Sequence, residues 1–376
     1  MLDDDLYKFT MCQAVIAKFP QAKARYQFIN RGEAKFTERF VQSLIYEICE
    51  MSTLRLSVSE MMFLMKECKE YLYPPFFEWL SQYQYNPTEV KLGLGDDGQL
   101  SVEIEGPWYR TILWEVKLMA LISELYFRDK AIDICSVSVD AVLKAHEINH
   151  CGLKVIDFGT RRRFSTAVHV AVLSRIREQL VGTSNLKMAM EHGLPVIGTM
   201  AHEWIMAHGA ICDYSDANES ALLNWRDIYG DSLSTALTDT YTSDVFFRNS
   251  RGIIFNAIRQ DSGDPLAFTD KAIRYYEEHG VDPKSKKIVF SDSLDIAKAT
   301  KIAEYCEGKI PCTFGIGTHL TNDIYGIKPL NMVIKMIAFA PNGKDWVHTV
   351  KLSDDSGKHT GDPEEVDRCK KSLGIS

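Results

Sequence analysis

Several short apolar segments in the second half of the chain each end in a cluster of Asp, Arg, Thr, Ser or Gly. These clusters are Asp157–Arg161, Thr183–Asn185, Thr199–His202, Asp239, Arg259–Asp264, Asp292 and Gly315–Thr318. Arginines neutralise phosphate charge, hydroxyls and amides bind phosphate oxygens, and carboxylates bind magnesium or ribose hydroxyls. Any one Asp or Thr could instead cap a helix. Because the clusters recur at most segment ends, the sequence indicates a site for a phosphorylated substrate and magnesium.

Three consecutive arginines, Arg161 to Arg163, follow a buried apolar segment and begin a predicted helix. A helix N-terminus favours anions, and cations there oppose the helix dipole. The placement is therefore costly unless an anion or a carboxylate compensates it. A solvated basic cap is the alternative interpretation. We interpret Arg161 as functional and at least one of the other two arginines as structural.

His202 lies where a predicted strand gives way to a helix, beside Glu203. His202 and His208 are six residues apart, so the sequence lacks the HExxH arrangement of zinc proteases. Two interpretations remain open from the spacing alone. A lone histidine is more often a core or capping residue. Alternatively, a neutral imidazole here could attack a phosphoryl group, with Glu203 or another nearby acid fixing its tautomer.

The segment Arg259–Pro265 places two carboxylates and an arginine around a glycine turn. Asp264 followed by Pro265 is typical of a helix N-terminus. That cap explains neither Arg259 nor Asp261, which makes these two the better functional candidates. Farther along, Gly315–Thr318 would let the backbone approach a phosphate, although so short a glycine pattern is common.

The elements that must position these residues alternate between strand and helix from about residue 153 onward. Such alternation predicts parallel strands with right-handed crossovers. Seven segments are close to the eight strands of a (β/α) barrel, so we predict an α/β fold with an irregular or open barrel. A doubly wound open sheet is the alternative, and the absence of GxGxxG after the first strand argues against dinucleotide binding. The predicted strand segments are 154–159, 181–183, 195–199, 236–239, 255–259, 288–292 and 312–317.

Both ends of the chain carry antiparallel and helical patterns instead. Apolar spacing predicts helices over 36–51, 58–73, 108–127 and 131–149. Alternation around turn residues predicts hairpins over 90–104 and 332–352. We therefore predict a smaller α+β domain from residues 1–130 plus 332–376, and the irregular barrel domain over residues 131–331.

The composition excludes several classes of protein. The 376 residues are 45% hydrophobic and carry a formal charge of −8, which is typical of a globular protein and not of a nucleic-acid-coating one. None of the nine cysteines forms a CxxC pair, which favours a reducing compartment. The N-terminus MLDDDLYK lacks signal-peptide character, and no apolar stretch is long enough for a membrane span. We expect a cytoplasmic protein without membrane or nucleic-acid partners.

Eight segments, in order and at similar spacing, resemble bacterial-type nicotinate phosphoribosyltransferases, which are type II phosphoribosyltransferases. They are Leu2–Lys8, Asp157–Ser165, Val181–Asn185, Gly198–Trp204, Asp261–Pro265, Phe290–Asp292, Phe314–Thr318 and Lys328–Asn331. One departure is Asp4, where relatives commonly carry a small hydroxyl residue. The resemblance implies that nicotinate and 5-phosphoribosyl 1-diphosphate give nicotinate mononucleotide and diphosphate, coupled to ATP hydrolysis. It also implies magnesium, an irregular barrel with a small domain, and a homodimer with shared active sites.

The resemblance also implies roles for single residues. His202 matches the histidine that ATP phosphorylates. Tyr7 matches a tyrosine that reaches into the partner chain's site and stacks on the pyridine ring, with Phe158 on the other face. Arg161, Arg259 and Asp261 match contacts to ring, ribose and phosphate.

Further substrate contacts match Thr199, Asp292, Gly315, Gly317 and Thr318, and Asp239 matches a magnesium ligand or a neighbour of one. Ser184 stands where nicotinamide-using relatives carry an acid. A hydroxyl there can donate to the nicotinate carboxylate, which an acid would repel.

Three alternative functions remain. A nicotinamide- or quinolinate-using phosphoribosyltransferase would share the same barrel. A non-catalytic sensor of phosphoribosyl ligands would keep the site without turnover. An unrelated barrel aldolase or phosphatase is less favoured, because no lysine stands at a strand end to form a Schiff base.

Overall fold

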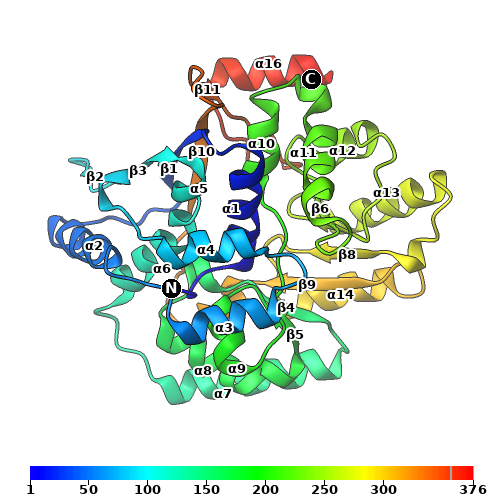
Figure 1. The fold of residues 1–376 in the computed structure, drawn as a ribbon. Helices are drawn as coiled ribbons and strands as arrows, with labels where there is room; N and C mark the ends of the chain where they lie inside the picture. The colour runs from blue at the N-terminus through cyan, green and yellow to red at the C-terminus, as the bar shows by residue number, and fades with distance from the viewer. Residues whose placement is uncertain (356–357, 376) are drawn as a thin grey trace.

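A computed structural model describes residues 1–355 and 358–375 of the chain, which form a mixed α/β fold with two separate sheets (Figure 1). The first sheet is antiparallel, with strand order β11-β10-β1-β3-β2. The second is parallel, with strand order β5-β4-β9-β8-β7-β6. The α/β class predicted from the sequence is therefore confirmed.

The parallel sheet has the strand order of a barrel opened at one point. Its first strand, β4, pairs with its last, β9, and β6 to β9 follow one another in sequence. The opening falls between β5 and β6. The predicted strand at 195–199 lies there but forms only a single bridge, from Val196 to Thr183, so six of the seven predicted strands are present. The strands are β4 (Val155–Asp157), β5 (Leu180–Thr183), β6 (Thr235–Leu237), β7 (Ala257–Gln260), β8 (Lys287–Phe290) and β9 (Cys312–Ile316).

The antiparallel sheet joins the two ends of the chain. Strand β1 pairs with β10 along its whole length and with β3 on its other side. Both predicted hairpins are present, as β2–β3 and β10–β11. The strands are β1 (Lys23–Asn30), β2 (Val90–Leu94), β3 (Leu100–Pro107), β10 (Met332–Ala340) and β11 (Val347–His348).

Helices surround both sheets and, in one case, fill the space between them. The predicted helix over 108–127 is divided into α5 and α6, and that over 58–73 ends early, before the pair of prolines that begins α4. The helices are α1 (Leu6–Lys18), α2 (Glu38–Met51), α3 (Val58–Glu67), α4 (Pro74–Gln82), α5 (Trp108–Thr111), α6 (Trp114–Phe127), α7 (Ile134–His150), α8 (Thr166–Ile176), α9 (Leu186–His192), α10 (His202–Gly209), α11 (Tyr214–Tyr229), α12 (Ser243–Asn249), α13 (Pro265–Glu278), α14 (Ile296–Cys306), α15 (Thr318–Thr321) and α16 (Pro363–Leu373).

Helix α1 runs through the middle of the molecule (Figure 1) and is buried on nearly every side. Apolar side chains such as Phe9 and Val15 pack in the core, yet the fully buried set also includes Lys8 and Thr10. Since a buried charge is costly unless it is paired, the polar residues of α1 need partners. Those partners lie in the site described below.

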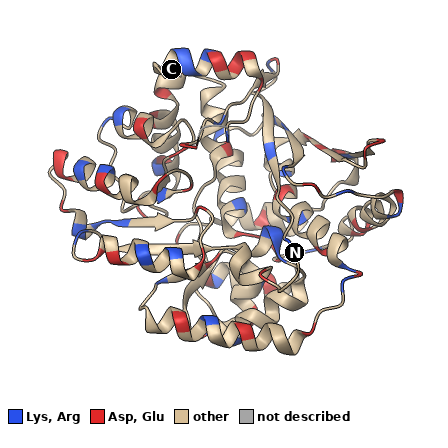
Figure 2. Cartoon of the chain, turned by 180° about the vertical axis from the view of Figure 1, so that it is seen from behind, with Lys and Arg blue, Asp and Glu red and all other residues tan. Residues whose placement is uncertain are grey.

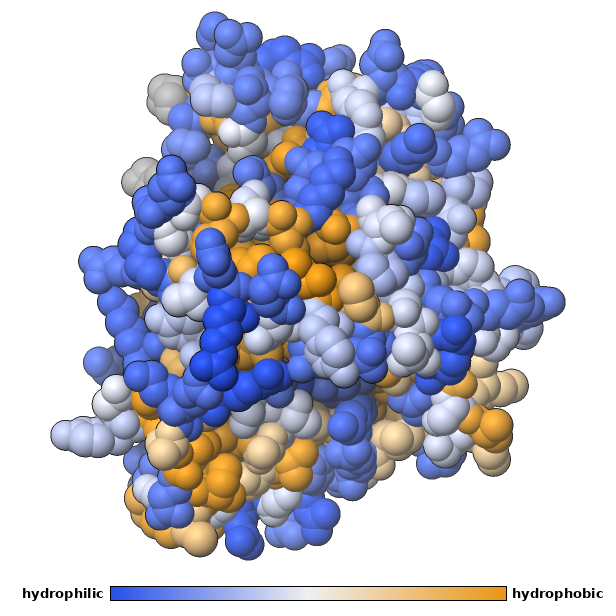
Figure 3. Space-filling model, turned by 90° about the vertical axis from the view of Figure 1, so that its left-hand side faces the viewer, coloured by the Kyte–Doolittle hydropathy of each residue, from blue (hydrophilic) through white to orange (hydrophobic). Residues whose placement is uncertain are grey.

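Charged residues of both signs are distributed along the chain (Figure 2), and the face seen in Figure 3 is largely hydrophilic. Figure 2 shows basic and acidic residues interspersed over the helices. Figure 3 shows apolar residues gathered in the middle and at the lower edge of one face. Exposed apolar side chains include Met62 and Met65 of α3 and Val142 and Leu143 of α7. None of the helices in the described residues is both long and apolar enough to cross a membrane.

Candidate active site

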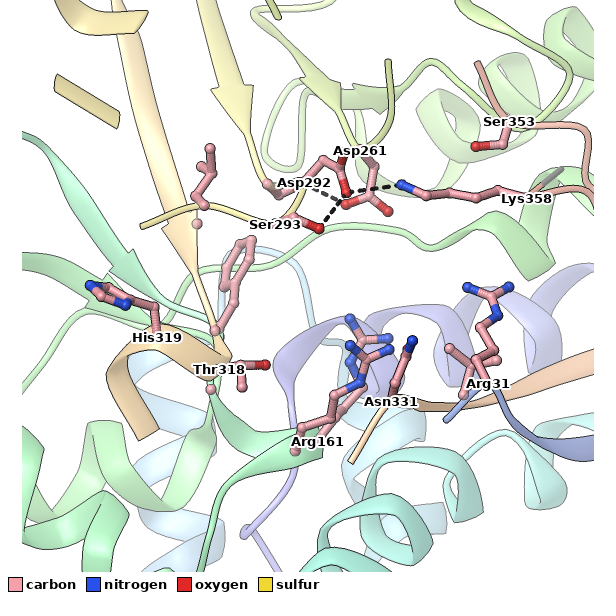
Figure 4. Close-up of a pocket in the computed structure, with 18 of the residues that line it drawn as sticks. Arg31, Arg161, Asp261, Asp292, Ser293, Thr318, His319, Asn331, Ser353 and Lys358 are labelled. Carbon is pink, nitrogen blue, oxygen red and sulfur yellow. Dashed lines mark hydrogen bonds and ion pairs between the residues drawn. The ribbon is translucent and has the colours of Figure 1, made fainter. Parts of the chain in front are cut away.

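A cavity of about 700 Å³ opens at the carboxyl ends of β4, β7, β8 and β9 and is bounded on its other side by β10 and the segment after β11. In Figure 4, Asp261, Asp292 and Lys358 face Arg31 and Arg161 across this space. Seven basic side chains line it against two carboxylates, Asp261 and Asp292, among the described residues; the basic ones are Arg31, Arg161, Arg162, Arg259, Lys335, Lys351 and Lys358. This excess of positive charge suits a ligand with several phosphates.

The protonation state of one of these basic side chains depends on the charges around it. Lys335 of β10 is half-buried at the wall of this cavity, and burial, followed by repulsion from Lys351, lowers the pKa of its ammonium to about 7. An anionic ligand in the cavity would favour the protonated ammonium.

Two smaller cavities lie next to the large one, and Arg161 and Arg259 line all three. One, of about 70 Å³, has aromatic and aliphatic walls that include Tyr7, Phe158 and Ile197. The other, of about 60 Å³, is lined by His202 together with several charged side chains. A flat ring would therefore lie near the first, and phosphates in the large cavity.

Phe158 can occupy its position only because two glycines face it. A Cβ atom on Gly315 would lie 2.3 Å from the Phe158 ring, and one on Gly317 would lie 3.0 Å from the Phe158 carbonyl oxygen. The Arg259 guanidinium lies 5.4 Å from the centre of the same ring. The glycines, which the sequence suggested as a phosphate cradle, thus allow the aromatic wall to form.

We expect Gly315→Ala to displace Phe158 and to weaken binding of an aromatic substrate, because the added methyl overlaps the ring. Overpacking of this kind costs about 1–3 kcal/mol of folding stability. Thermal unfolding and substrate titration would measure both effects. Gly93→Ala in β2, where the nearest heavy atom to the added methyl is at 3.6 Å, is the matched control. Unchanged substrate binding by the Gly315 variant would contradict this account.

Arg259, Asp261 and Ser291 form one hydrogen-bonded cluster at the ends of β7 and β8. Arg259 donates to Asp261 and to Ser291, each at 2.8 Å, and the Ser291 hydroxyl donates to Asp261 at 2.6 Å. Burial alone would raise the pKa of the Asp261 carboxyl, but Arg259, His202 and Lys351 outweigh it and hold that pKa well below its usual range. Asp261 is therefore an ionised hydrogen-bond acceptor at neutral pH.

His202 begins α10 and contacts this cluster. Its Nδ1 lies 3.0 Å from the Thr240 hydroxyl, and its Nε2 lies 2.9 Å from the Lys351 ammonium and 3.1 Å from Asp261. Burial, followed by the nearby Lys351 charge, lowers the pKa of His202 to about 4. The imidazole is thus neutral at neutral pH and carries a lone pair that can act as a nucleophile.

Glu203 does not contact His202, contrary to one possibility raised by the sequence. Adjacent residues of a helix project about 100° apart, so the two side chains point in different directions. Glu203 instead accepts hydrogen bonds from Lys8 at 2.5 Å and from the Tyr26 hydroxyl at 2.6 Å. Thr240 and Asp261 take the places beside the imidazole.

Asp239 lies beside His202 and could share a metal ion with its neighbours. One ligand atom from each of His202, Asp239 and Asp261 falls within 4.8 Å of the others. Asp239 accepts a hydrogen bond from the Ser262 hydroxyl through Oδ2, whereas its buried Oδ1 has no hydrogen-bond partner among the described residues. Two carboxylates, one of them with an unpartnered oxygen, suit the oxygen preference of magnesium.

Tyr7 lines both small cavities of its own chain, next to Arg161. That Tyr7 reaches into a partner chain's site stays a prediction. The position of Tyr7 in its own chain follows from the path of α1, which runs beside the sheet end: residue 6 donates its amide hydrogen to the Ser184 carbonyl, and Thr10 donates its hydroxyl to the Thr199 carbonyl.

Ser184 and Thr199 line the aromatic cavity, as the sequence suggested, together with Asp5, which was missed. The Ser184 hydroxyl donates to Asp5 at 2.9 Å, and the Thr160 hydroxyl donates to the same oxygen at 2.7 Å. In this structure the Ser184 proton is thus directed to Asp5 and not into the cavity. The three acids before Leu6 were the signal that could have indicated Asp5.

The three consecutive arginines point in different directions. Arg161 lines all three cavities, and Arg162 lines the large one while donating to the Met332 carbonyl at 3.0 Å. Arg163 is buried and makes a two-pronged contact with Asp3, at 2.7 and 2.6 Å, and an ion pair with Glu124. Arg163 therefore holds the N-terminus against the barrel.

The rim of the large cavity contains the remaining predicted residues. Thr318, at the start of α15, and Asp292, after β8, both line it, and Asp292 lies 3.5 Å from Lys358. Sequence reasoning missed Lys335, Lys351 and Lys358. They come from β10 and the segment after β11, outside the parallel strand ends on which the prediction depended.

Comparisons with known proteins cover nearly the whole chain. Residues 2–123 match the model of the nicotinate phosphoribosyltransferase (NAPRTase) N-terminal domain, and residues 153–376 match that of the nicotinate phosphoribosyltransferase (NAPRTase) family. Among curated relatives, the nicotinate phosphoribosyltransferase of Chromohalobacter salexigens is 44% identical over 391 residues, covering 100% of this chain and 98% of the relative. That of Desulforapulum autotrophicum is also 44% identical, covering 99% of this chain and 98% of the relative.

Among solved structures, the crystal structure of nicotinate phosphoribosyltransferase from Porphyromonas gingivalis superposes with a TM-score of 0.97. It is 42% identical, and the match covers 100% of this chain and 99% of that one.

Proposed function

The chain belongs to the nicotinate phosphoribosyltransferase family, and from this premise we propose how its cavities carry out the reaction. It is a nicotinate phosphoribosyltransferase, an enzyme of NAD biosynthesis that uses nicotinate and 5-phosphoribosyl 1-diphosphate. The proposal rests on one observation: a polycationic cavity and an aromatic cavity lie side by side, and Arg161 and Arg259 line both of them. Such a pairing would hold a ring and a phosphorylated sugar side by side.

We propose that nicotinate binds in the aromatic cavity between Phe158 and Tyr7, with its carboxylate directed to Arg161. The ring nitrogen then faces the ribose carbon that loses diphosphate. The nitrogen is already a nucleophile, so no general base is required. The site's contribution is to align the reactants and to stabilise the charge that leaves with the diphosphate.

The diphosphate and the 5-phosphate are proposed to lie in the large cavity, bound by Arg259, Lys358 and the Gly315–Thr318 turn. Asp261, which lines that cavity, and the buried Asp239 beside it would hold magnesium, and when bound that ion would neutralise diphosphate charge. Asp292 is proposed to bind ribose hydroxyls. The Arg259–Asp261–Ser291 hydrogen bonds fix these groups before the substrate arrives.

His202 is proposed to couple ATP hydrolysis to the transfer. Its Nε2 lone pair forms a bond to the γ-phosphorus of ATP, the bond from that phosphorus to the bridging oxygen breaks, and ADP leaves. The Lys351 ammonium, 2.9 Å from Nε2, would then pair with the new phosphoryl group. The added charge beside Asp239 and Asp261 changes the affinity of the large cavity for diphosphate and its magnesium complex.

Nicotinate is expected to bind far more tightly than nicotinamide. A carboxylate can accept two parallel hydrogen bonds from the Arg161 guanidinium and pairs with its charge, whereas a neutral amide offers one acceptor oxygen and no charge, a difference of about 1.5–3 kcal/mol. Competition of each compound against labelled nicotinate would measure it. Equal binding would favour the nicotinamide-using alternative, and tighter binding of a dicarboxylate would favour quinolinate.

The reaction itself is tested by incubating the protein with nicotinate and 5-phosphoribosyl 1-diphosphate, with and without ATP. We expect nicotinate mononucleotide and diphosphate in equal amounts, at a higher rate with ATP. Binding of both substrates without turnover under either condition would instead support the sensor alternative.

The assembly and location of the protein are also proposals. We propose a homodimer with shared active sites, as the resemblance implies. Sedimentation across a dilution series, with activity measured in parallel, tests both statements. We propose a cytoplasmic location because all nine cysteines, each among the described residues, are free thiols.

A further inference from the structure

A buried lysine of α1 joins two acidic residues next to the site. The Lys8 ammonium is fully buried and lies 2.5 Å from Oε2 of Glu115 and 2.5 Å from Oε1 of Glu203. Glu115 comes from α6 and Glu203 from α10, so three helices meet at this one charge. Both acids line the small cavity that contains His202 and Arg161.

Glu115 lies between two cations but is held more closely by one of them. Its Oε2 is 2.5 Å from Lys8, whereas its Oε1 is 3.5 Å from Arg161. Burial would raise the pKa of the Glu115 carboxyl, but Lys8 and Arg161 outweigh it and lower that pKa, so the group is ionised. The other acid, Glu203, has a second partner in the Tyr26 hydroxyl at 2.6 Å.

The long contact between Arg161 and Glu115 leaves most of the hydrogen-bond donors of Arg161 available. A guanidinium offers five N–H donors and binds a carboxylate best through two parallel hydrogen bonds. The one ion pair that Arg161 makes with the described residues, at 3.5 Å, uses little of that capacity. The Arg161 side chain also keeps 37% of its surface exposed, in contrast to Glu115 at 10%. Arg161 is thus poised for a second carboxylate.

We infer that Lys8 is a positioning residue: by holding Glu115, it prevents a tight Glu115–Arg161 pair and leaves Arg161 free to bind the substrate carboxylate. This inference rests on the proposed function, in which Arg161 binds nicotinate. Without Lys8, Glu115 can turn toward Arg161 and form the two-pronged pair that the substrate would otherwise make. The internal carboxylate then competes with the external one.

A double-mutant cycle tests the inference by isothermal titration of nicotinate. We expect Lys8→Met to weaken nicotinate binding roughly 10- to 100-fold, the range for loss of a charged hydrogen bond. Adding Glu115→Gln to that variant removes the competing carboxylate and should restore most of the affinity. Lys18→Met, on the same helix but paired with Asp227 at the surface, is the matched control and should bind nicotinate normally.

A purely structural role for Lys8 predicts a different pattern. In that case both Lys8 variants would show the same weakened binding, and this result would overturn the inference. The KM for 5-phosphoribosyl 1-diphosphate gives a second readout, because a competing carboxylate at Arg161 should raise the KM for nicotinate more than that for the phosphoribosyl substrate.

Two single variants keep the test decisive if Lys8→Met fails to fold. Glu115→Gln leaves the Lys8–Glu203 pair in place, and we expect its nicotinate affinity to equal or exceed that of the unchanged protein. A loss of affinity in this variant would overturn the inference. Arg161→Gln tests the underlying proposal separately, since unchanged nicotinate binding there would contradict the assignment of Arg161 and not the position of Lys8.

Discussion

Replacing His202 with asparagine is expected to abolish the stimulation of product formation by ATP. Asparagine can still donate to Thr240 or Asp261 but offers no imidazole lone pair to a phosphorus atom. The rate with ATP should therefore fall to the rate measured without it. Coupling between an effector site and a substrate site is commonly worth about 5- to 150-fold, which sets the size of the expected loss. Initial rates with and without ATP would measure it.

His208→Asn is the matched control for this substitution. His208 lies on the same helix and is also buried, but its Nδ1 contacts the Trp204 carbonyl and its Nε2 contacts Asn224. We expect that variant to lose stability and to keep its response to ATP. A His202→Asn protein that is still stimulated by ATP would contradict the proposed phosphohistidine.

Replacing Arg259 with glutamine is expected to lower kcat/KM about 10²–10³-fold, as for the loss of one charge-stabilising donor in a water-excluded site. Arg259 lines all three cavities, fixes Asp261 at 2.8 Å and lies over Phe158. Its loss removes positive charge from the departing diphosphate and frees the Asp261 carboxylate to repel it. Steady-state kinetics in both substrates would measure the effect.

Arg251→Gln is the control for Arg259, because Arg251 is a well-exposed arginine whose ion pairs involve Asp216 and Glu219. Surface substitutions of this kind usually change stability by less than about 0.5 kcal/mol. The two variants should therefore differ in kcat/KM by nearly the whole predicted factor. A similar small effect in both would show that Arg259 does not stabilise the departing group.

The residues that meet at the ends of the parallel strands were predictable because their meeting follows from the geometry of the fold. Once strands alternate with helices, the groups after each strand must meet at one edge. The rule placed Phe158, Asp261 and Asp292 around the same cavity without any knowledge of their contacts. It failed at residues 195–199, where an apolar segment with strand composition forms only a bridge at the opening of the barrel.

Contacts between distant segments could not be predicted in this way. Lys351 reaches His202 across 149 positions, and Lys8 reaches Glu203 across 195. No periodicity connects residues so far apart, and the sequence does not distinguish a buried lysine from an exposed one. Glu203 illustrates the consequence. The sequence suggested the adjacent His202 as its partner, whereas in the structure Glu203 contacts Lys8 of α1.

The most direct test of this account is to incubate the protein with γ-labelled ATP and to locate the label. We predict a phosphate that is lost in acid, retained in base and carried by the peptide that contains His202. Label on a different residue, or none on a protein whose rate is nevertheless stimulated by ATP, would contradict it.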